Sequence, residues 1–235
     1  MTTAHRKHDP GSMTGTSPCP WLDDAAHATA LADAYLNHGI FGGALWDLAT
    51  ARRRTPTTRD VIDIEDLYAP ALLSSPVRRG AAKAIIDRAD SITGRLQQIP
   101  HRLTLWNVDV SAVDDALGHA HELIVELDAI KHVGSTLASK LVAAKRPDLI
   151  PIRDRETAGA LHVPPKTPWL DYWHGWRDAL DPDTVSTLRQ TSIDVGHFGL
   201  SPLRTADIIV WMSETGWHQL PKGSTWDELR CACRG

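Results

Sequence analysis

The spacing of apolar residues constrains this chain more than any other feature of its sequence. Along most of the chain, apolar residues recur every three or four positions, which is the period of an amphipathic α-helix. The alternation typical of a half-buried strand is confined to one short candidate at residues 101–110. The sequence therefore predicts an all-α, multi-helix globular domain.

Start and stop signals divide the periodic segments into separate helices. Pro76 is well placed to open one helix, and Ser201 followed by Pro202 is a strong start signal for another. Residues 39–60 are expected to be irregular. The predicted helices lie at residues 22–37, 63–73, 76–98, 111–129, 135–145, from 154 onward, 168–180, 181–190 and 201–212.

Length and composition fit one domain. A chain of 235 residues can bury a substantial core, and its net charge of −4 leaves no chain-wide basic footprint for nucleic acid. The composition of residues 1–18 predicts a disordered tail, and residues 19–235 are expected to form a single all-α domain. Neither an export signal nor a bilayer-spanning apolar run is recognised, so a cytoplasmic location with no membrane partner is expected.

Sequence patterns typical of metal and cofactor sites are missing. Cys231 and Cys233 form a pair, but no second pair completes a zinc site. The 12 histidines show no metal-ligand spacing, and no phosphate-binding loop, dinucleotide fingerprint or nucleophile elbow is present. We therefore expect neither a metal nor a cofactor.

The most informative segment reads IKHVGSTLASKLVAAKRPDLIPIRD and spans residues 130–154. Gly134 permits a positive φ at the start of a helix, where exposed N–H groups and the helix dipole can bind a phosphate. Ala138 is small enough to let two helices pack closely. Asp154 stands at the start of the next helix, where a carboxylate could stabilise a developing oxocarbenium cation or orient a water. Its alternative role is purely structural, because aspartate is a common N-cap.

This segment resembles the hairpin of the helix–hairpin–helix DNA glycosylase superfamily, the family of endonuclease III. Ile130, Val133 and Gly134 match the apolar, apolar and glycine positions of its hairpin, and Ala138 matches the alanine of its second helix. Asp154 falls at the spacing of the family's catalytic aspartate. The resemblance implies a helix–hairpin–helix, glycosylase-like fold with Asp154 as its catalytic residue.

Three positions depart from the family's pattern. Lys131 replaces the proline of the hairpin, and His132 replaces its first glycine. Thr136 stands where some members carry a nucleophilic lysine. The resemblance therefore implies the monofunctional kind of glycosylase, in which water cleaves the N-glycosidic bond and no Schiff base forms.

The resemblance also implies a contact surface for double-stranded DNA and a pocket for an extruded base. Between residues 131 and 155, six basic residues stand against two acidic ones, although a solvated surface explains this charge equally well. The predicted nucleic-acid-binding residues are Lys131, His132, Gly134, Ser135, Thr136, Lys140, Lys145, Arg146, Arg153 and Arg155. The predicted pocket residues are Trp169, Tyr172 and Trp173, for which core packing is the structural alternative.

Three ordered blocks of sequence resemble a bacterial domain-of-unknown-function family. They read IEDLYAPALLSSPVRRGAAKAIIDR, KHVGSTLASKLVAAKRPDLIPIRD and SPLRTADIIVWM, within a match that covers most of residues 28–215. This second resemblance implies no activity. The candidate functions are a DNA-repair hydrolase resembling a monofunctional DNA glycosylase, a non-catalytic nucleic-acid-binding module that keeps the same fold, and a protein-interaction module.

Overall fold

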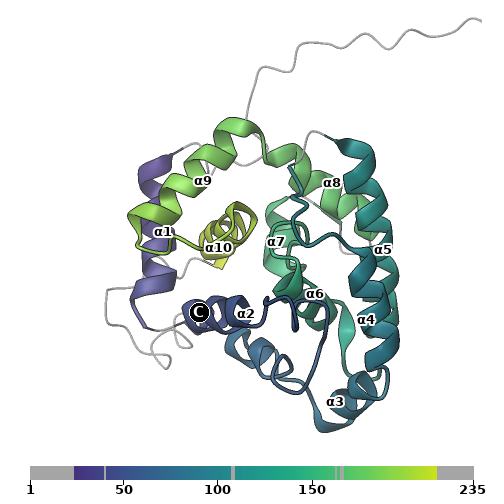
Figure 1. Ribbon diagram of the computed structural model, residues 1–235. Coiled ribbons are helices and arrows are strands. Elements are labelled where there is room, and N and C mark those ends of the chain that lie inside the picture. The colour runs from purple at the N-terminus through teal and green to yellow at the C-terminus, as the bar shows by residue number, and fades with distance from the viewer. Residues whose placement is uncertain (1–23, 40, 107–108, 162, 165–166, 216–235) are drawn as a thin grey trace, which may run out of the picture.

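The computed structural model describes residues 24–39, 41–106, 109–161, 163–164 and 167–215 (Figure 1). Within these residues the chain forms helices joined by turns, and it contains no strand, which confirms the all-α prediction for this part. The predicted tail at residues 1–18 lies outside them, as do residues 216–235. The elements are α1 (Ala25–Asn37), α2 (Gly43–Arg52), the 3-10 helix η2 (Ala69–Leu73), α3 (Arg79–Ile86), α4 (Ala89–Gln98), α5 (Val110–Asp128), α6 (Gly134–Lys145), α7 (Arg155–Ala160), α8 (Trp169–Ala179), α9 (Pro182–Asp194) and α10 (Pro202–Thr215).

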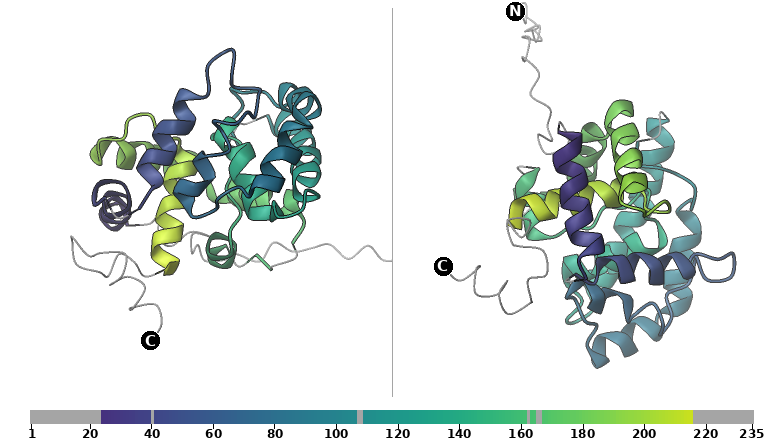
Figure 2. Two further views of the ribbon diagram at one scale, coloured as in Figure 1. Left: turned by 90° about the horizontal axis from the view of Figure 1, so that it is seen from below. Right: turned by 90° about the vertical axis from the view of Figure 1, so that its left-hand side faces the viewer.

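The helices pack in two groups that are connected through α2, which contacts both α1 and α6. Helix α10 packs against α1, α7 and α9, and helix α5 packs against α4, α6 and α8. Helix α2 and η2 contact one another and α6, so they close the lower side of the view in Figure 1. The right-hand view of Figure 2 shows α10 crossing α1. This arrangement brings residues from both ends of the described chain to one region.

Buried tryptophans fill much of the core. Trp46, Trp173 and Trp176 are each at most 1% exposed, which agrees with the packing role that such large apolar side chains usually have. Trp169 and Trp211 are partly buried and pack against the same core. Among the described residues, no helix is both long enough and apolar enough to cross a membrane.

The prediction that residues 39–60 are irregular is wrong over Gly43–Arg52, which form helix α2. Gly42 and Gly43 resemble a helix break in the sequence, yet they stand at the start of α2 because the packing there is too close for a side chain. A β-carbon on Gly42 would lie 2.3 Å from the carbonyl oxygen of Leu72, and one on Gly43 would lie 1.9 Å from the ring of Tyr35. The glycines therefore permit contact between α2, η2 and α1.

Two further predictions need correction. The helix expected at residues 76–98 is divided into α3 and α4 at Asp87 and Arg88, where Arg88 leaves the helical conformation with ψ of 13°. The strand candidate at residues 101–110 is wrong over its described part, because residues 101–106 contain turns and Val110 begins α5. Leu105 donates one backbone hydrogen bond to Asp148 at 2.8 Å, which is too little pairing to make a ladder.

Candidate functional site

The hairpin segment joins α5 to α6 through a short turn. His132 has a φ of 72° and Gly134 a φ of 65°, so the turn uses the left-handed region at two positions. A histidine in that conformation costs roughly 1–2 kcal/mol relative to glycine, and the fold accepts this cost. The replacement of the hairpin glycine by His132 therefore leaves a positive φ in the turn.

The first part of the predicted nucleic-acid surface is accessible. Lys131, His132, Gly134 and Ser135 are exposed, and Thr136 is half-buried. His132 is also close to a second basic segment, because its Nδ1 lies 3.5 Å from the guanidinium of the exposed residue Arg78. The turn thus presents basic side chains together with the N-terminal N–H groups of α6, an arrangement able to contact phosphate.

Asp154 is the N-cap of α7, as the structural alternative predicts. Its Oδ1 accepts hydrogen bonds from the backbone N–H of Thr157 at 2.8 Å and from the Thr157 hydroxyl at 2.9 Å, completing a capping box. Burial raises the pKa of Asp154, and the nearby charge of Glu156 acts in the same direction. The cap engages one carboxylate oxygen and leaves Oδ2 for another contact.

Asp154 also lines a cavity of about 340 Å³. One wall is aromatic. The rings of Tyr35 and Phe41 are stacked, with their centres 5.0 Å apart, and the ring of Trp211 lies edge-on to both, with centre-to-centre distances of 5.8 Å to Tyr35 and 5.7 Å to Phe41. A volume of this size lies at the lower end of the range of small-molecule pockets. Structural capping and a place in a pocket wall are therefore both properties of Asp154.

Charged side chains also line this aromatic pocket. Lys140 donates hydrogen bonds to the Leu73 carbonyl at 2.9 Å and to Ser75 Oγ at 2.7 Å, and burial lowers its pKa. Asp207 pairs with Arg204, one turn earlier on α10. Burial raises the pKa of Asp207 to about 7, since desolvation outweighs the opposing charge of Arg204.

The Oδ1 atom of Asp207 is buried and has no hydrogen-bond partner among the described residues. Buried polar atoms are nearly always paired, and each exception in a folded protein requires an explanation. Asp207 lines the aromatic pocket, so a ligand that donates a hydrogen bond there would satisfy this oxygen. The pocket therefore contains a carboxyl group whose pKa is raised to about 7 and one of whose two oxygens has no hydrogen-bond partner among the described residues.

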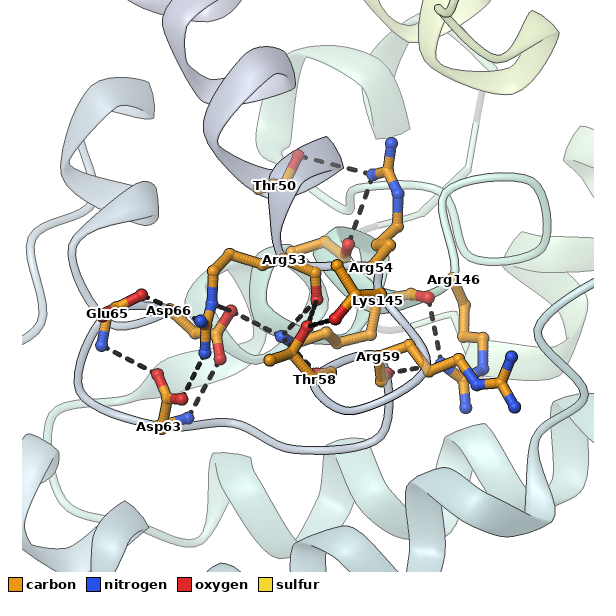
Figure 3. Close-up of polar contacts among 12 residues, drawn as sticks. Thr50, Arg53, Arg54, Thr58, Arg59, Asp63, Glu65, Asp66, Lys145 and Arg146 are labelled. Atoms are coloured by element: carbon orange, nitrogen blue, oxygen red, sulfur yellow. Dashed lines mark hydrogen bonds and ion pairs between the residues drawn. The ribbon is translucent and has the colours of Figure 1, made fainter.

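Lys145 and Arg146, both predicted to bind nucleic acid, are buried instead (Figure 3). Lys145 Nζ lies 2.5 Å from Asp66 Oδ1 and 3.1 Å from the Thr58 carbonyl. Arg146 lies 2.5 Å from Asp60 and donates to several backbone carbonyls. These two side chains fix the segment after α2 to the end of α6, so they are not part of an accessible phosphate track.

The remaining predicted residues lie apart from the aromatic pocket. Tyr172 and Trp173 are fully buried, and the Tyr172 hydroxyl donates to the Ile152 carbonyl at 2.7 Å. The guanidinium of Arg153 lies 4.7 Å from the ring centre of Trp169. Neither these aromatic residues nor Arg153 lines the aromatic pocket. The predicted base pocket is thus replaced by core packing in α8.

Arg155 behaves differently from Arg153. Its side chain is 92% exposed and lies 2.7 Å from Glu156. Glu156 in turn lines the aromatic pocket beside Asp154. Arg155 itself does not line the pocket, and its exposed side chain remains available for contact with a nucleic acid.

Most residues of the aromatic pocket were not predicted from the sequence, because they come from separate elements, mainly α1, η2 and α10. Asp207 and Arg204 are three residues apart, a spacing that predicts an ion pair but does not indicate its burial. Among the described residues, no group of His, Cys, Asp and Glu is arranged to hold a metal ion. The charged groups that line the pocket are three carboxyl groups, the ammonium group of Lys140 and the guanidinium of Arg204.

Comparison with known proteins yields one match. A family described as a family of unknown function (DUF6308) matches residues 28–214, which is most of the chain and includes every wall of the aromatic pocket. No curated protein and no solved structure matches the chain.

Proposed function

The chain belongs to this family of unknown function (DUF6308), and we propose that it binds nucleic acid and hydrolyses an N-glycosidic bond in the aromatic pocket. One observation carries the proposal: Asp154 and Asp207 lie in one aromatic-walled pocket, where the charge of Asp154 contributes to the raised pKa of Asp207. Glycosidic hydrolysis commonly relies on carboxyl groups in two protonation states.

The aromatic wall suits a flat ring. An extruded base is held by stacking and by hydrogen bonds to its edge, and Tyr35, Phe41 and Trp211 offer the apolar faces. Extrusion of a base costs a few kcal/mol, which such contacts must offset. A damaged or modified base is the preferred occupant, because it is easier to unstack.

The two carboxyl groups have different roles in the proposed reaction. The C1′–N bond breaks, the sugar develops oxocarbenium character, and the oxygen of water joins C1′. Asp154 Oδ2, ionised, stabilises that positive charge or accepts a proton from the attacking water. Asp207, with a pKa near neutrality, donates a proton to the departing base. No nucleophilic lysine is needed in this scheme.

The turn between α5 and α6 supports the nucleic-acid part of the proposal. Ser74 and Ser75 line the pocket, and Arg78 follows them in the chain and lies 3.5 Å from His132 of the turn. Lys131 and Arg155 are exposed and carry positive charge. We propose that this turn holds the phosphates of a duplex from which one base enters the pocket.

The decisive experiment compares Asp154→Asn with Asp181→Asn. Asp181 is the N-cap of α9, where it accepts from Thr184 at 2.8 Å, and it lies outside the pocket. Both variants keep a residue that caps helices well, so both should fold. Duplexes carrying alkylated, deaminated or oxidised bases are incubated with each protein, and abasic sites are counted.

We expect the wild type and Asp181→Asn to release a base and Asp154→Asn to lose this activity by at least a hundredfold, in the range of one acid–base group. All three should bind DNA alike. Folded wild-type protein that binds DNA but releases no base from the whole panel would refute hydrolysis and support the non-catalytic module.

A further inference from the structure

A second and larger cleft lies on the other side of Arg204 from the aromatic pocket. Its volume is about 960 Å³, and its walls come from α2, from α9 and the connection to α10, and from residues 101–106. Arg204 lines both cavities and separates them. We call this second cavity the α2–α9 cleft.

Arg54 is the unusual cation of the α2–α9 cleft. Its guanidinium contacts Thr50 Oγ1 at 3.5 Å and the Ala144 carbonyl at 3.4 Å, both through Nη1 and both long. Burial lowers its pKa, and the charges of Asp148 and Asp47, which also line the cleft, oppose that shift. Among the described residues neither carboxylate lies at ion-pair distance from Arg54. Figure 3 shows this guanidinium turned away from Arg53 and Lys145. A partly desolvated guanidinium with no carboxylate at ion-pair distance can gain such a partner from a bound ligand.

The other polar groups of the cleft extend this pattern. Arg189, exposed on α9, also lacks a carboxylate partner among the described residues, and it acts together with Arg54 on the charge of Asp148. Asp47 bonds Arg204 through Oδ1, whereas its Oδ2 is buried and has no partner in the described structure. The cleft thus offers guanidinium donors for an anion and a carboxylate oxygen for a ligand N–H or O–H.

The rim of the α2–α9 cleft is apolar and exposed. Leu45 is 60% exposed and Phe198 is 77% exposed, and both line the cleft. Leu48 and Ile193 continue the same rim and are also exposed. Exposed apolar side chains gathered around one cavity are typical of a binding site, and an aromatic ring among them can stack on a base.

We propose that the α2–α9 cleft binds a phosphate-bearing ligand of nucleotide size, with the phosphate on Arg54 and Arg189 and the base against Phe198 and Leu45. The unpartnered Asp47 oxygen accepts a hydrogen bond from the ligand's sugar or base. This inference does not depend on glycosidic hydrolysis, because the binding groups belong to another cavity. The phosphate can come from a free nucleotide or from the backbone of a single strand.

The test measures binding by calorimetry for the wild type, Arg54→Gln, Arg189→Gln and Arg52→Gln. Arg52 is exposed at the end of α2 and does not line the cleft, so Arg52→Gln makes the same charge change without touching the site. The probes are inorganic pyrophosphate, adenosine monophosphate, adenosine and short oligothymidylates with and without a 5′-phosphate.

We expect saturable binding of adenosine monophosphate and little binding of adenosine. Arg54→Gln should weaken the phosphate-dependent affinity roughly tenfold or more, the usual loss for hydrogen bonds to a charged group, and Arg52→Gln should leave it unchanged. Arg189→Gln, a surface change that poses little risk to folding, should also weaken it. Tighter binding of the unphosphorylated oligonucleotide, sensitive to Arg54→Gln, would identify the backbone as the source.

Absence of saturable binding for every phosphate probe would overturn the proposal, as would equal losses in Arg54→Gln and Arg52→Gln. The same titrations on Asp154→Asn separate the two proposals. That variant should keep full phosphate affinity even if the protein hydrolyses no glycosidic bond, because Asp154 does not line the α2–α9 cleft.

Discussion

Replacement of Lys145 by methionine tests whether this lysine is structural or binds nucleic acid. The ammonium group of Lys145 is fully buried and lies 2.5 Å from Asp66, whose side chain is only 4% exposed. Lys145→Met leaves Asp66 with the Arg53 guanidinium at 3.5 Å and the Asp63 N–H at 3.0 Å. Removal of one partner from a buried ion pair typically costs about 3–5 kcal/mol, and we expect the lower half of that range because these two donors remain.

The free energy of unfolding is measured by urea denaturation for Lys145→Met, Asp66→Leu and the double variant. The double variant should recover much of the loss, because it leaves no unpaired buried charge. Lys131→Met is the matched control: Lys131 is exposed, so its replacement should change stability by less than about 0.5 kcal/mol.

The opposite outcome would show that the reasoning about burial is wrong. In that outcome, Lys145→Met would be as stable as the wild type but would bind DNA more weakly. The slope of its DNA affinity against salt concentration would also fall by about one phosphate contact. That result would show that Lys145 is accessible and binds nucleic acid, as the sequence predicts.

Two further predictions concern the hairpin turn and the aromatic pocket. Gly134→Ala should lower the free energy of unfolding by about 1–2 kcal/mol in urea denaturation, because φ there is 65°, while a matched change at Gly80, which has open space around it, should not. Asp207→Asn should alter the pH dependence of the free energy of unfolding. Because the pKa of Asp207 is raised in the folded protein, the folded chain keeps a proton there that the unfolded chain has released. The free energy of unfolding of the wild type therefore falls as the pH rises from about 4 to about 7. The variant should lack that part of the fall in thermal denaturation across this range, and parallel curves for the two proteins would contradict the assignment.

Local signals in the sequence located most helices. Ser201 and Pro202 predict the start of α10 to within a residue, since a capping side chain and a proline in the first turn act locally. Helix α2 was not predicted because Gly42 and Gly43 look like a helix break in the sequence. Their lack of side chains makes room for the Leu72 carbonyl and the Tyr35 ring, which belong to other elements, and a local sequence pattern does not show these contacts.

Only those residues of the candidate site that lie close together in the sequence could be predicted. Asp154 was found from its distance to Gly134 within one segment, and the structure places it in a pocket wall. Its neighbours Tyr35 and Asp207 come from opposite ends of the described chain, and only the packing of α1 against α10 brings them there. For the same reason Lys140, which reads as a surface cation, is turned inward by contacts with the η2 segment.

Arg204 gives the two cavities a common element. Its guanidinium lies 3.1 Å from Asp47 in the α2–α9 cleft and pairs with Asp207 in the aromatic pocket, and each of these carboxylates keeps one buried oxygen without a partner in the described structure. Burial raises the pKa of both carboxyl groups, and the charge of Arg204 opposes that shift at each of them. A ligand that donates a hydrogen bond to the free Asp47 oxygen favours the ionised form of Asp47 and therefore lowers its pKa. The two proposed sites are distinct in their contacts and share this buried arginine as a common partner.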